Sequence, residues 1–468
     1  MKQRNRVVLL VTLASTGAWA QEFSGFSTTM LQYGKQDVPG FNQTIAPGTE
    51  FLGIDGTHLG SDALSLHLYG WGAMDLGDQS LPFGKSAGDL SYAYLDYRFG
   101  QANAELKAGR FAVNQGAGVE QVDGVSARTD LRGGFNLSAF FGTPVHYKTQ
   151  ELRPGTNYDY KYQTDVIFGS RLGYRLGTVG EVGVSYLQDG TTKVEDIATP
   201  PPVDFTRKQV GTDLRLAPVA RLEITGHTLF DVASHYQAPG TPGQSPSRVA
   251  EEDYAASYKF SPVATLTVNY VERNLEAYFA GTNLPDLFHL DTPDKIKAKG
   301  GTLALGPADA VQVILDYRQT DRETYGTTTR YGADVRWAVP ESKYQAGGGF
   351  HKVSSPDLLM PTAIPYSFAP ALFGMSREEY RAWVMYQGKS FHASLDGIFY
   401  QFDDSSNPNL YSKSTITQVV GSVGMNPTAN LSVSGDLTYA LDAYYKNQVS
   451  VLLRTTYRFS IASKGGSK

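Results

Sequence analysis

Hydrophobic and polar side chains alternate with a period of two, in segments of about ten to fourteen residues, from one end of the chain to the other. From Leu64 to Tyr69 every second residue is a leucine, and polar or aromatic residues stand between. From Val449 to Phe459 the apolar positions alternate with a face that carries Arg454. Successive side chains of a strand point to opposite faces, whereas a helix repeats every ~3.6 residues. The pattern therefore predicts β-strands throughout.

Short and long connections alternate between these segments. Eleven longer polar loops fall at residues 35–49, 76–88, 112–121, 143–163, 190–205, 233–250, 274–294, 319–327, 353–375, 403–412 and 441–446. Ten tight turns are predicted near Gly60, Gly100, Gly133, Gly177, Pro218, Pro262, Pro307, Pro340, Gly388 and Pro427. All 23 prolines fall within these loops and turns, as expected for a residue that cannot donate to a strand ladder. Ten turns and eleven loops join twenty-two strands.

A secreted sandwich or propeller could also be built from alternating strands. Strict segregation of short and long connections is instead typical of membrane barrels, which have short periplasmic turns and long extracellular loops. Aromatic residues such as Tyr97, Phe99 and Tyr457 close the apolar face near turns, as in an interfacial girdle. We therefore predict an all-β fold, a transmembrane antiparallel β-barrel of about 22 strands, in which the first and last strands pair.

The first twenty residues have the pattern of a signal peptide. Lys2, Arg4 and Arg6 precede an apolar stretch, and Ala18-Trp19-Ala20 has the form of a cleavage site. The predicted organisation is a signal peptide at 1–20, a barrel at 21–459 and a short tail at 460–468. Export and a barrel together predict a location in the outer membrane of a Gram-negative bacterium.

The chain resembles bacterial outer-membrane porins, through its signal, its alternating strands and a final strand that ends Tyr457-Arg458-Phe459. The resemblance implies outer-membrane lipid as the surroundings and the barrel-assembly machinery as a partner. Here nine residues, Ser460 to Lys468, follow the final aromatic residue, which departs from the family pattern. Gly109-Arg110-Phe111 followed by Asp123-Gly124 also resembles a short segment of several substrate-porin families.

Composition removes several other functions. The chain has no cysteine, which excludes thiolate metal sites, cysteine nucleophiles and covalent attachment of c-type haem. A formal net charge of −5 does not favour nucleic-acid binding. The eight histidines show no HExxH spacing and no serine lies in a GxSxG elbow. We expect no enzyme activity, no metal and no cofactor.

Alternation places charged residues of both signs on the face opposite the apolar one, where they are candidates to line a pore. The basic candidates are Arg98, Lys107, Arg171, Arg175, Arg215, Arg318, Arg336 and Arg454. The acidic candidates are Asp96, Glu105, Asp213, Glu223, Asp316, Asp334 and Asp436. Such charges either set the selectivity of the pore or pair across strands and keep the wall wet. Because both signs are mixed, we expect a broad polar path without strong ion selectivity.

Two functions fit these features. The first is a porin with a water-filled channel for passive diffusion of small hydrophilic solutes. The alternative is the barrel sheath of a porin–cytochrome complex, with a periplasmic multihaem cytochrome as partner in extracellular electron transfer. A barrel of about 22 strands is wide enough to need filling, by the long loops 353–375, 274–294 and 143–163 or by an inserted protein, unless the true strand number is smaller by two or four. Whether the barrel forms a homo-oligomer is left open by the sequence.

Overall fold

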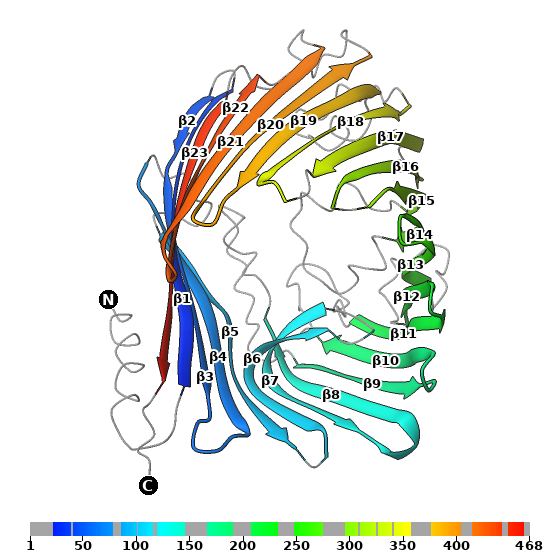
Figure 1. Ribbon diagram of the computed structural model, residues 1–468. Coiled ribbons are helices and arrows are strands. Elements are labelled where there is room, and N and C mark those ends of the chain that lie inside the picture. Colours follow the sequence, from blue (N-terminus) through cyan, green and yellow to red (C-terminus); the bar gives the residue numbers. More distant parts are fainter. Residues whose placement is uncertain are drawn as a thin grey trace, which may run out of the picture.

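The strands of the protein close into a single antiparallel barrel (Figure 1). The computed structural model describes residues 22–38, 41–77, 86–100, 102–114, 116, 119–145, 166–190, 207–232, 248–274, 295–307, 309–323, 326–338, 341–356, 376–403, 414–441 and 448–462. The strands are β1 (Glu22–Val38), β2 (Phe41–Ile45), β3 (Pro47–Thr57), β4 (Leu64–Asp75), β5 (Ser86–Phe99), β6 (Ala104–Asn114), β7 (Val119–Asp130), β8 (Phe135–Pro144), β9 (Val166–Arg175), β10 (Gly180–Gly190), β11 (Arg207–Val219), β12 (Leu222–Asp231), β13 (Arg248–Ser261), β14 (Ala264–Asn274), β15 (Lys295–Leu305), β16 (Val311–Arg322), β17 (Gly326–Ala338), β18 (Tyr344–Ser354), β19 (Arg377–Gln387), β20 (Phe391–Phe402), β21 (Thr415–Thr428), β22 (Leu431–Leu441) and β23 (Gln448–Ala462). Among the described residues, a 3-10 turn at Arg132–Gly134 lies between β7 and β8.

The first and last strands close the barrel, as predicted. β1 pairs with β23 over fifteen residue pairs, from Glu22 opposite Ala462 to Gln36 opposite Gln448. On its other side β1 pairs first with β3 and then, near its end, with β2. β2 and β3 are thus the upper and lower parts of one interrupted strand, so the 23 segments form a closed barrel of 22 strands. The predicted fold class is confirmed.

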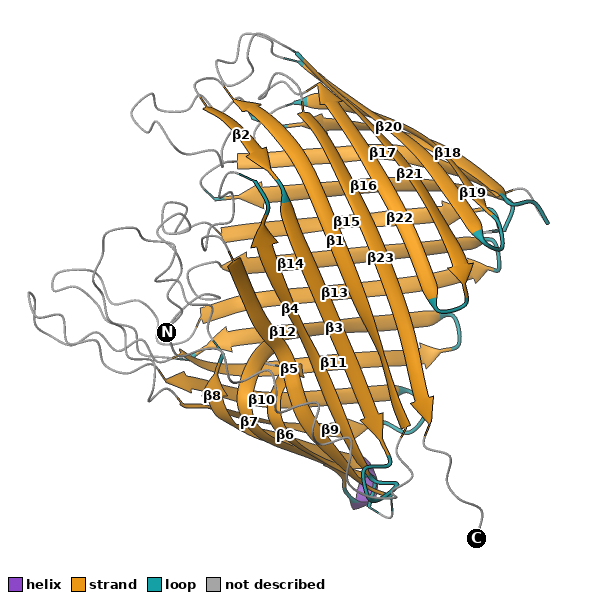
Figure 2. Ribbon diagram, turned by 90° about the vertical axis from the view of Figure 1, so that its left-hand side faces the viewer, coloured by secondary structure: helices purple, strands orange, loops and turns teal. Residues whose placement is uncertain are grey.

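All ten predicted tight turns join consecutive strands, and Figure 2 shows turns at the end of the barrel where β23 terminates. Strands also run further than predicted into several loops, and part of loop 35–49 forms the β1–β2 hairpin. The expectation that every proline avoids the strands is wrong at strand ends. Pro47 and Pro144 are terminal residues of strands, and Pro218 and Pro427 lie at register shifts. A missing N–H is tolerated at such positions.

The outer surface of the barrel is apolar. Leu315 on β16 lies opposite Leu303 on one side and Ala333 on the other, and Leu315 is 42% exposed. Near the turns, Tyr97 and Phe99 form an edge-to-face pair with ring centroids 4.7 Å apart. Within the described ranges, no helix is long and apolar enough to span a bilayer. A closed sheet with an apolar outer belt satisfies its backbone within the protein, and the chain is a protein of the bacterial outer membrane, as predicted.

β6 and β7 leave the barrel wall and turn into the lumen (Figure 1). Gly109, Gly124 and Gly142 stand side by side in the β6–β7–β8 ladder. A Cβ at any of the three would lie less than 3.0 Å from a neighbouring backbone oxygen, too close for a real side chain, and Gly109 has φ of +129°. Glycine permits the close approach and the positive φ that such a bend requires. This row of glycines is therefore the hinge at which the strands turn inward.

We call residues 111–114, 116 and 119–122 the infolded hairpin. Phe111, Val113 and Val122 from the hairpin are at most 4% exposed. They belong to a core cluster inside the barrel whose wall members are Phe140, Ile167, Leu187, Leu229 and Ala250. Burying each such large side chain stabilises the protein by about 1.5–3 kcal/mol. The hairpin is thus fixed to one side of the inner wall.

Candidate functional site

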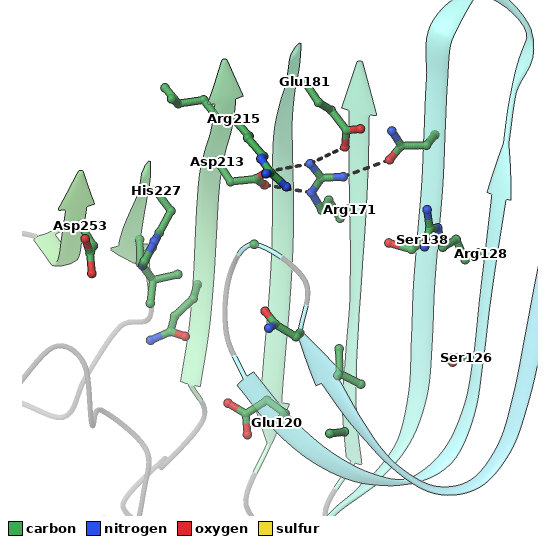
Figure 3. A pocket seen from close by; sticks show the side chains of 18 of the residues that line it. Glu120, Ser126, Arg128, Ser138, Arg171, Glu181, Asp213, Arg215, His227 and Asp253 are labelled. Atoms are coloured by element: carbon green, nitrogen blue, oxygen red, sulfur yellow. Dashed lines mark hydrogen bonds and ion pairs between the residues drawn. The ribbon is translucent and has the colours of Figure 1, made fainter. Parts of the chain in front are cut away.

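A cavity of about 1390 Å³ lies between the infolded hairpin and the inner wall (Figure 3). Strands β6 to β13 contribute its lining, and Asn114, Gly116 and Glu120 contribute from the hairpin. Among the lining residues are five Lys or Arg side chains and six Asp or Glu side chains. The site therefore has a dense but nearly balanced set of charges.

Arg171 is the centre of the charge network in this cavity (Figure 3). Its Nε and Nη2 donate to the two carboxylate oxygens of Asp213 at 2.9 and 2.6 Å. Its Nη1 donates to Asn136 Oδ1 at 3.0 Å, and its Nη2 lies 2.9 Å from Glu181 Oε1. A Cβ at Gly183 would lie 2.5 Å from Nη2, so the glycine makes room for the guanidinium. Bidentate pairing of this kind fixes geometry as well as charge.

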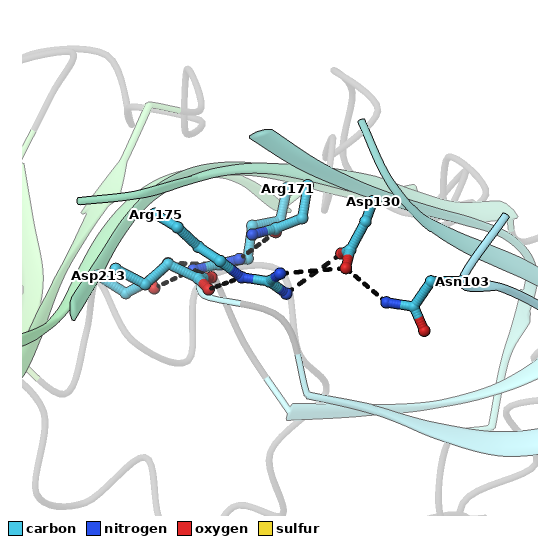
Figure 4. A network of polar contacts seen from close by, with 7 residues as sticks. Asn103, Asp130, Arg171, Arg175 and Asp213 are labelled. Atoms are coloured by element: carbon cyan, nitrogen blue, oxygen red, sulfur yellow. Dashed lines mark hydrogen bonds and ion pairs between the residues drawn. The ribbon is translucent and has the colours of Figure 1, made fainter. Parts of the chain in front are cut away.

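The network continues toward the β7–β8 turn through Arg175 (Figure 4). Arg175 Nη1 and Nη2 donate to the carboxylate of Asp130 at 3.1 and 3.2 Å. Asp130 also accepts a hydrogen bond from Asn103 Nδ2 at 2.5 Å, and Arg175 Nε lies 3.5 Å from Glu181. Arg171 and Arg175 are thereby linked by the carboxylate of Glu181.

Polar contacts also hold the infolded hairpin to the wall. Glu120 on the hairpin forms an ion pair with Arg207 on β11, which in turn lies 3.5 Å from Asp189 on β10. Gly116 is packed so closely that a Cβ there would lie 3.0 Å from Asp213 Oδ2. The hairpin is therefore attached both by an apolar core and by a charged contact.

Other predicted residues of this wall are paired as well. Arg98 Nε donates to Asp96 at 3.2 Å, and Lys107 Nζ lies 3.2 Å from Glu105. Arg215 Nη2 lies 3.2 Å from Glu223. Of the predicted residues, the structure brings five to the cavity lining, namely Glu105, Lys107, Arg171, Asp213 and Arg215.

A second charged cluster lies on β16 to β18. His351 Nε2 is 2.6 Å from Asp316 Oδ1 and 3.4 Å from Asp334 Oδ2. Ligand-type atoms of these three residues lie within 4.8 Å of one another. Arg330 Nη1 donates to the second oxygen of Asp316 at 2.8 Å. This neighbouring cation favours an ion-paired wall over a cation site.

The remaining predicted residues make other contacts or lie beside the second cluster, where Arg318 is opposite Arg330. Arg336 donates to Gln345 at 2.9 Å, and Arg454 lies 3.9 Å from Asp436. Arg318 has no ion-pair partner among the residues that the structure describes. The prediction that all of the charged candidates line a conducting path is not tested by the structure.

Sequence reasoning missed the infolded hairpin and its anchor, the Glu120–Arg207 pair. A signal was present, because Phe111, Val122 and Leu187 are apolar at positions whose parity points into the lumen. The loops 143–163, 274–294 and 353–375, which were predicted to narrow the lumen, lie outside the described residues except at their ends. The structure thus packs described parts of loop 112–121 inside the barrel, whereas the sequence predicts it only as one of eleven long loops.

No family model and no curated protein matches the sequence. Among solved structures, the chain is similar to the ferric enterobactin receptor PfeA from Pseudomonas aeruginosa, at 10% identity and a TM-score of 0.55, covering 95% of this chain and 81% of that one. Acinetobacter baumannii OccAB4 gives 10% identity and a TM-score of 0.44 over 94% and 98% of the two chains. Pseudomonas aeruginosa OpdO gives 10% identity and a TM-score of 0.42 over 94% and 97%. The likeness to PfeA supports the fold of a large outer-membrane barrel.

Proposed function

We propose that this barrel is a passive channel for small hydrophilic solutes, in which the infolded hairpin narrows the lumen. The observation that carries the proposal is the charged cavity between the hairpin and the wall. Its cations and anions lie on inward-facing positions, and the opposite face of the same strands is apolar. A wall of this kind keeps water inside the barrel and lipid outside.

The pairing of the charges bears on selectivity. Arg171 faces both Asp213 and Glu181, and Lys107 faces Glu105. Fixed charges that cancel at short range leave little net field for either sign of ion. We therefore propose weak ion selectivity and a limit set mainly by size.

The proposal is tested with the purified protein in planar lipid bilayers. We expect stable single-channel current steps in KCl, a reversal potential near zero in a KCl gradient, and conductance that falls when small polyethylene glycols enter the lumen. A correctly folded protein that gives no current steps would contradict the proposal.

The alternative, a sheath around a periplasmic multihaem cytochrome, has less support. The infolded hairpin already occupies part of the lumen and is held there by buried Phe111, Val113 and Val122. A cytochrome threaded through the barrel would compete with this segment for space. We therefore retain the passive channel as the proposed function.

Changing Arg171 to Gln should make the channel cation-selective. The substitution leaves Asp213 and Glu181 without their shared cation, so the cavity gains an uncompensated negative charge. We expect the ratio of K⁺ to Cl⁻ permeability to rise by about threefold or more, as measured from reversal potentials. The double variant R171Q/D213N restores the balance and should return the ratio toward that of the parent. An unchanged ratio in R171Q would show that the network only supports the wall.

A further inference from the structure

One part of the inner wall is aromatic rather than charged. Phe26, Phe51, Tyr69, Tyr92 and Tyr94, on β1, β3, β4 and β5, make up this part, which we call the aromatic strip. All five are half-buried. Their orientation follows from the register. Phe26 and Tyr69 both lie opposite Gly53, and Tyr69 lies opposite Tyr92, while the intervening outward positions include exposed Leu52 and Leu95.

The rings of the strip form a continuous series. Tyr69 contacts Phe26, Phe51 and Tyr92 with ring centroids 6.0, 6.4 and 5.5 Å apart. Tyr92 contacts Tyr94 at 5.9 Å. Tyr94 in turn contacts Phe111 at 6.5 Å, edge to face. The strip therefore leads across the inner wall to the base of the infolded hairpin, where the lumen is narrowed.

The strip is amphipathic, because three of its rings are tyrosines. Among the residues that the structure describes, the hydroxyls of Tyr69, Tyr92 and Tyr94 have no hydrogen-bond partner. Here flat apolar ring faces and hydroxyl groups lie together on the inner face of the sheet.

We propose that the aromatic strip binds the rings of neutral sugars as they approach the constriction. The inference rests on the proposed channel function and names the class of solute that the channel favours. A pyranose ring has one face rich in C–H groups and a rim of hydroxyls. The C–H face can lie on an aromatic ring, and the hydroxyls can exchange hydrogen bonds with the tyrosines.

The charged residues beside the strip favour a neutral sugar over an aromatic acid as the solute. One cation beside the strip is Lys107, whose Nζ lies 5.6 Å from the centroid of Tyr94. Lys107 is already paired with Glu105 at 3.2 Å, and His67 beside the strip is hydrogen-bonded to Asp55 at 2.6 Å. Among the described residues, the cations beside the strip are therefore already paired, and an anionic ring would meet no uncompensated one. A neutral polyol ring meets no penalty of this kind.

The test measures block of the ion current by maltotriose in planar bilayers, with polyethylene glycol of similar size as the reference solute. The variants Tyr69→Leu and Tyr92→Leu remove one ring each and keep apolar volume. We expect the concentration of maltotriose for half-maximal block to rise about threefold to tenfold in each. Block by polyethylene glycol should not change.

Tyr400→Leu is the matched control. Tyr400 lies on β20 opposite Glu379, outside the strip, and contacts Arg377 instead. Its substitution should leave block by maltotriose unchanged, and heat-modifiable migration on gels confirms that each variant folds. Equal effects in the control and the strip variants would overturn the inference, as would stronger block by benzoate than by maltotriose.

Binding is also measured without conduction, by saturation-transfer NMR of maltotriose with the detergent-solubilised protein. Transfer to the sugar ring protons that falls in Tyr69→Leu and Tyr92→Leu, but not in Tyr400→Leu, supports the strip as the binding surface. A parent protein that conducts KCl and shows no transfer overturns the sugar inference alone. A parent protein that binds sugar and never conducts contradicts the proposed channel and leaves the binding surface in place.

Discussion

Replacing residues 112–121 with a two-residue Asn-Gly turn should raise the single-channel conductance by about twofold or more, because the segment that narrows the lumen is removed. The hairpin carries Val113 into the core and Glu120 to Arg207. Without it, the wall residues of the cavity are open to water and the free cross-section increases. Single-channel recordings in planar bilayers measure the change.

Two point variants test whether the packing of the hairpin against the wall, and not only its length, determines the conductance. Val122→Asp places a charge in a fully buried apolar site, which should detach the hairpin and reproduce the rise in conductance. Phe111→Leu keeps the core apolar and should conduct like the parent. If the shortened hairpin folds and conducts no more than the parent, the constriction lies elsewhere in the lumen.

The strand pattern could be predicted because parity is local. Leu315 points to the lipid face and its neighbour Asp316 to the lumen, and the local sequence is enough to assign both directions. The infolded hairpin depends on contacts between residues far apart in sequence. Val122 on β7 joins the cluster that contains Ile167, Leu187 and Leu229 only after five further strands, β8 to β12, have formed. Choosing loops by length alone favoured 353–375 over 112–121, and length does not encode where a loop packs.

The ion-pair partners of the charged candidates likewise cannot be predicted from alternation alone. Arg171 on β9 reaches Asp213 on β11 across the intervening strand β10. This contact is possible because Gly183 on β10 lies directly between them, opposite Gly173 and Asp213. Parity placed Arg171 on the correct face. Alternation could not show whether Arg171 is paired or free, because its pairing with Asp213 depends on a glycine on another strand, Gly183.

Leu315→Arg should destabilise the folded barrel in bilayers by about 2–4 kcal/mol, the cost of a basic side chain on the lipid face near the midplane. Leu315 lies opposite Ala333 on β17, and the exposed aromatic residues Trp337 and Tyr331 lie on either side of Ala333 along that strand. Reversible folding into lipid vesicles, followed by urea titration, measures the difference.

Ile314, the residue before Leu315, supplies the control, because its side chain points to the opposite face of the same strand. Ile314→Arg places the same side chain on the inner face, opposite Asp334, where water and a carboxylate receive it. We expect its effect on the free energy of unfolding to stay within about 1 kcal/mol. Equal destabilisation by the two variants would contradict the inside–outside assignment of β16. A large cost at Leu315 with a small cost at Ile314 would show that lipid contacts one face of this strand and water the other.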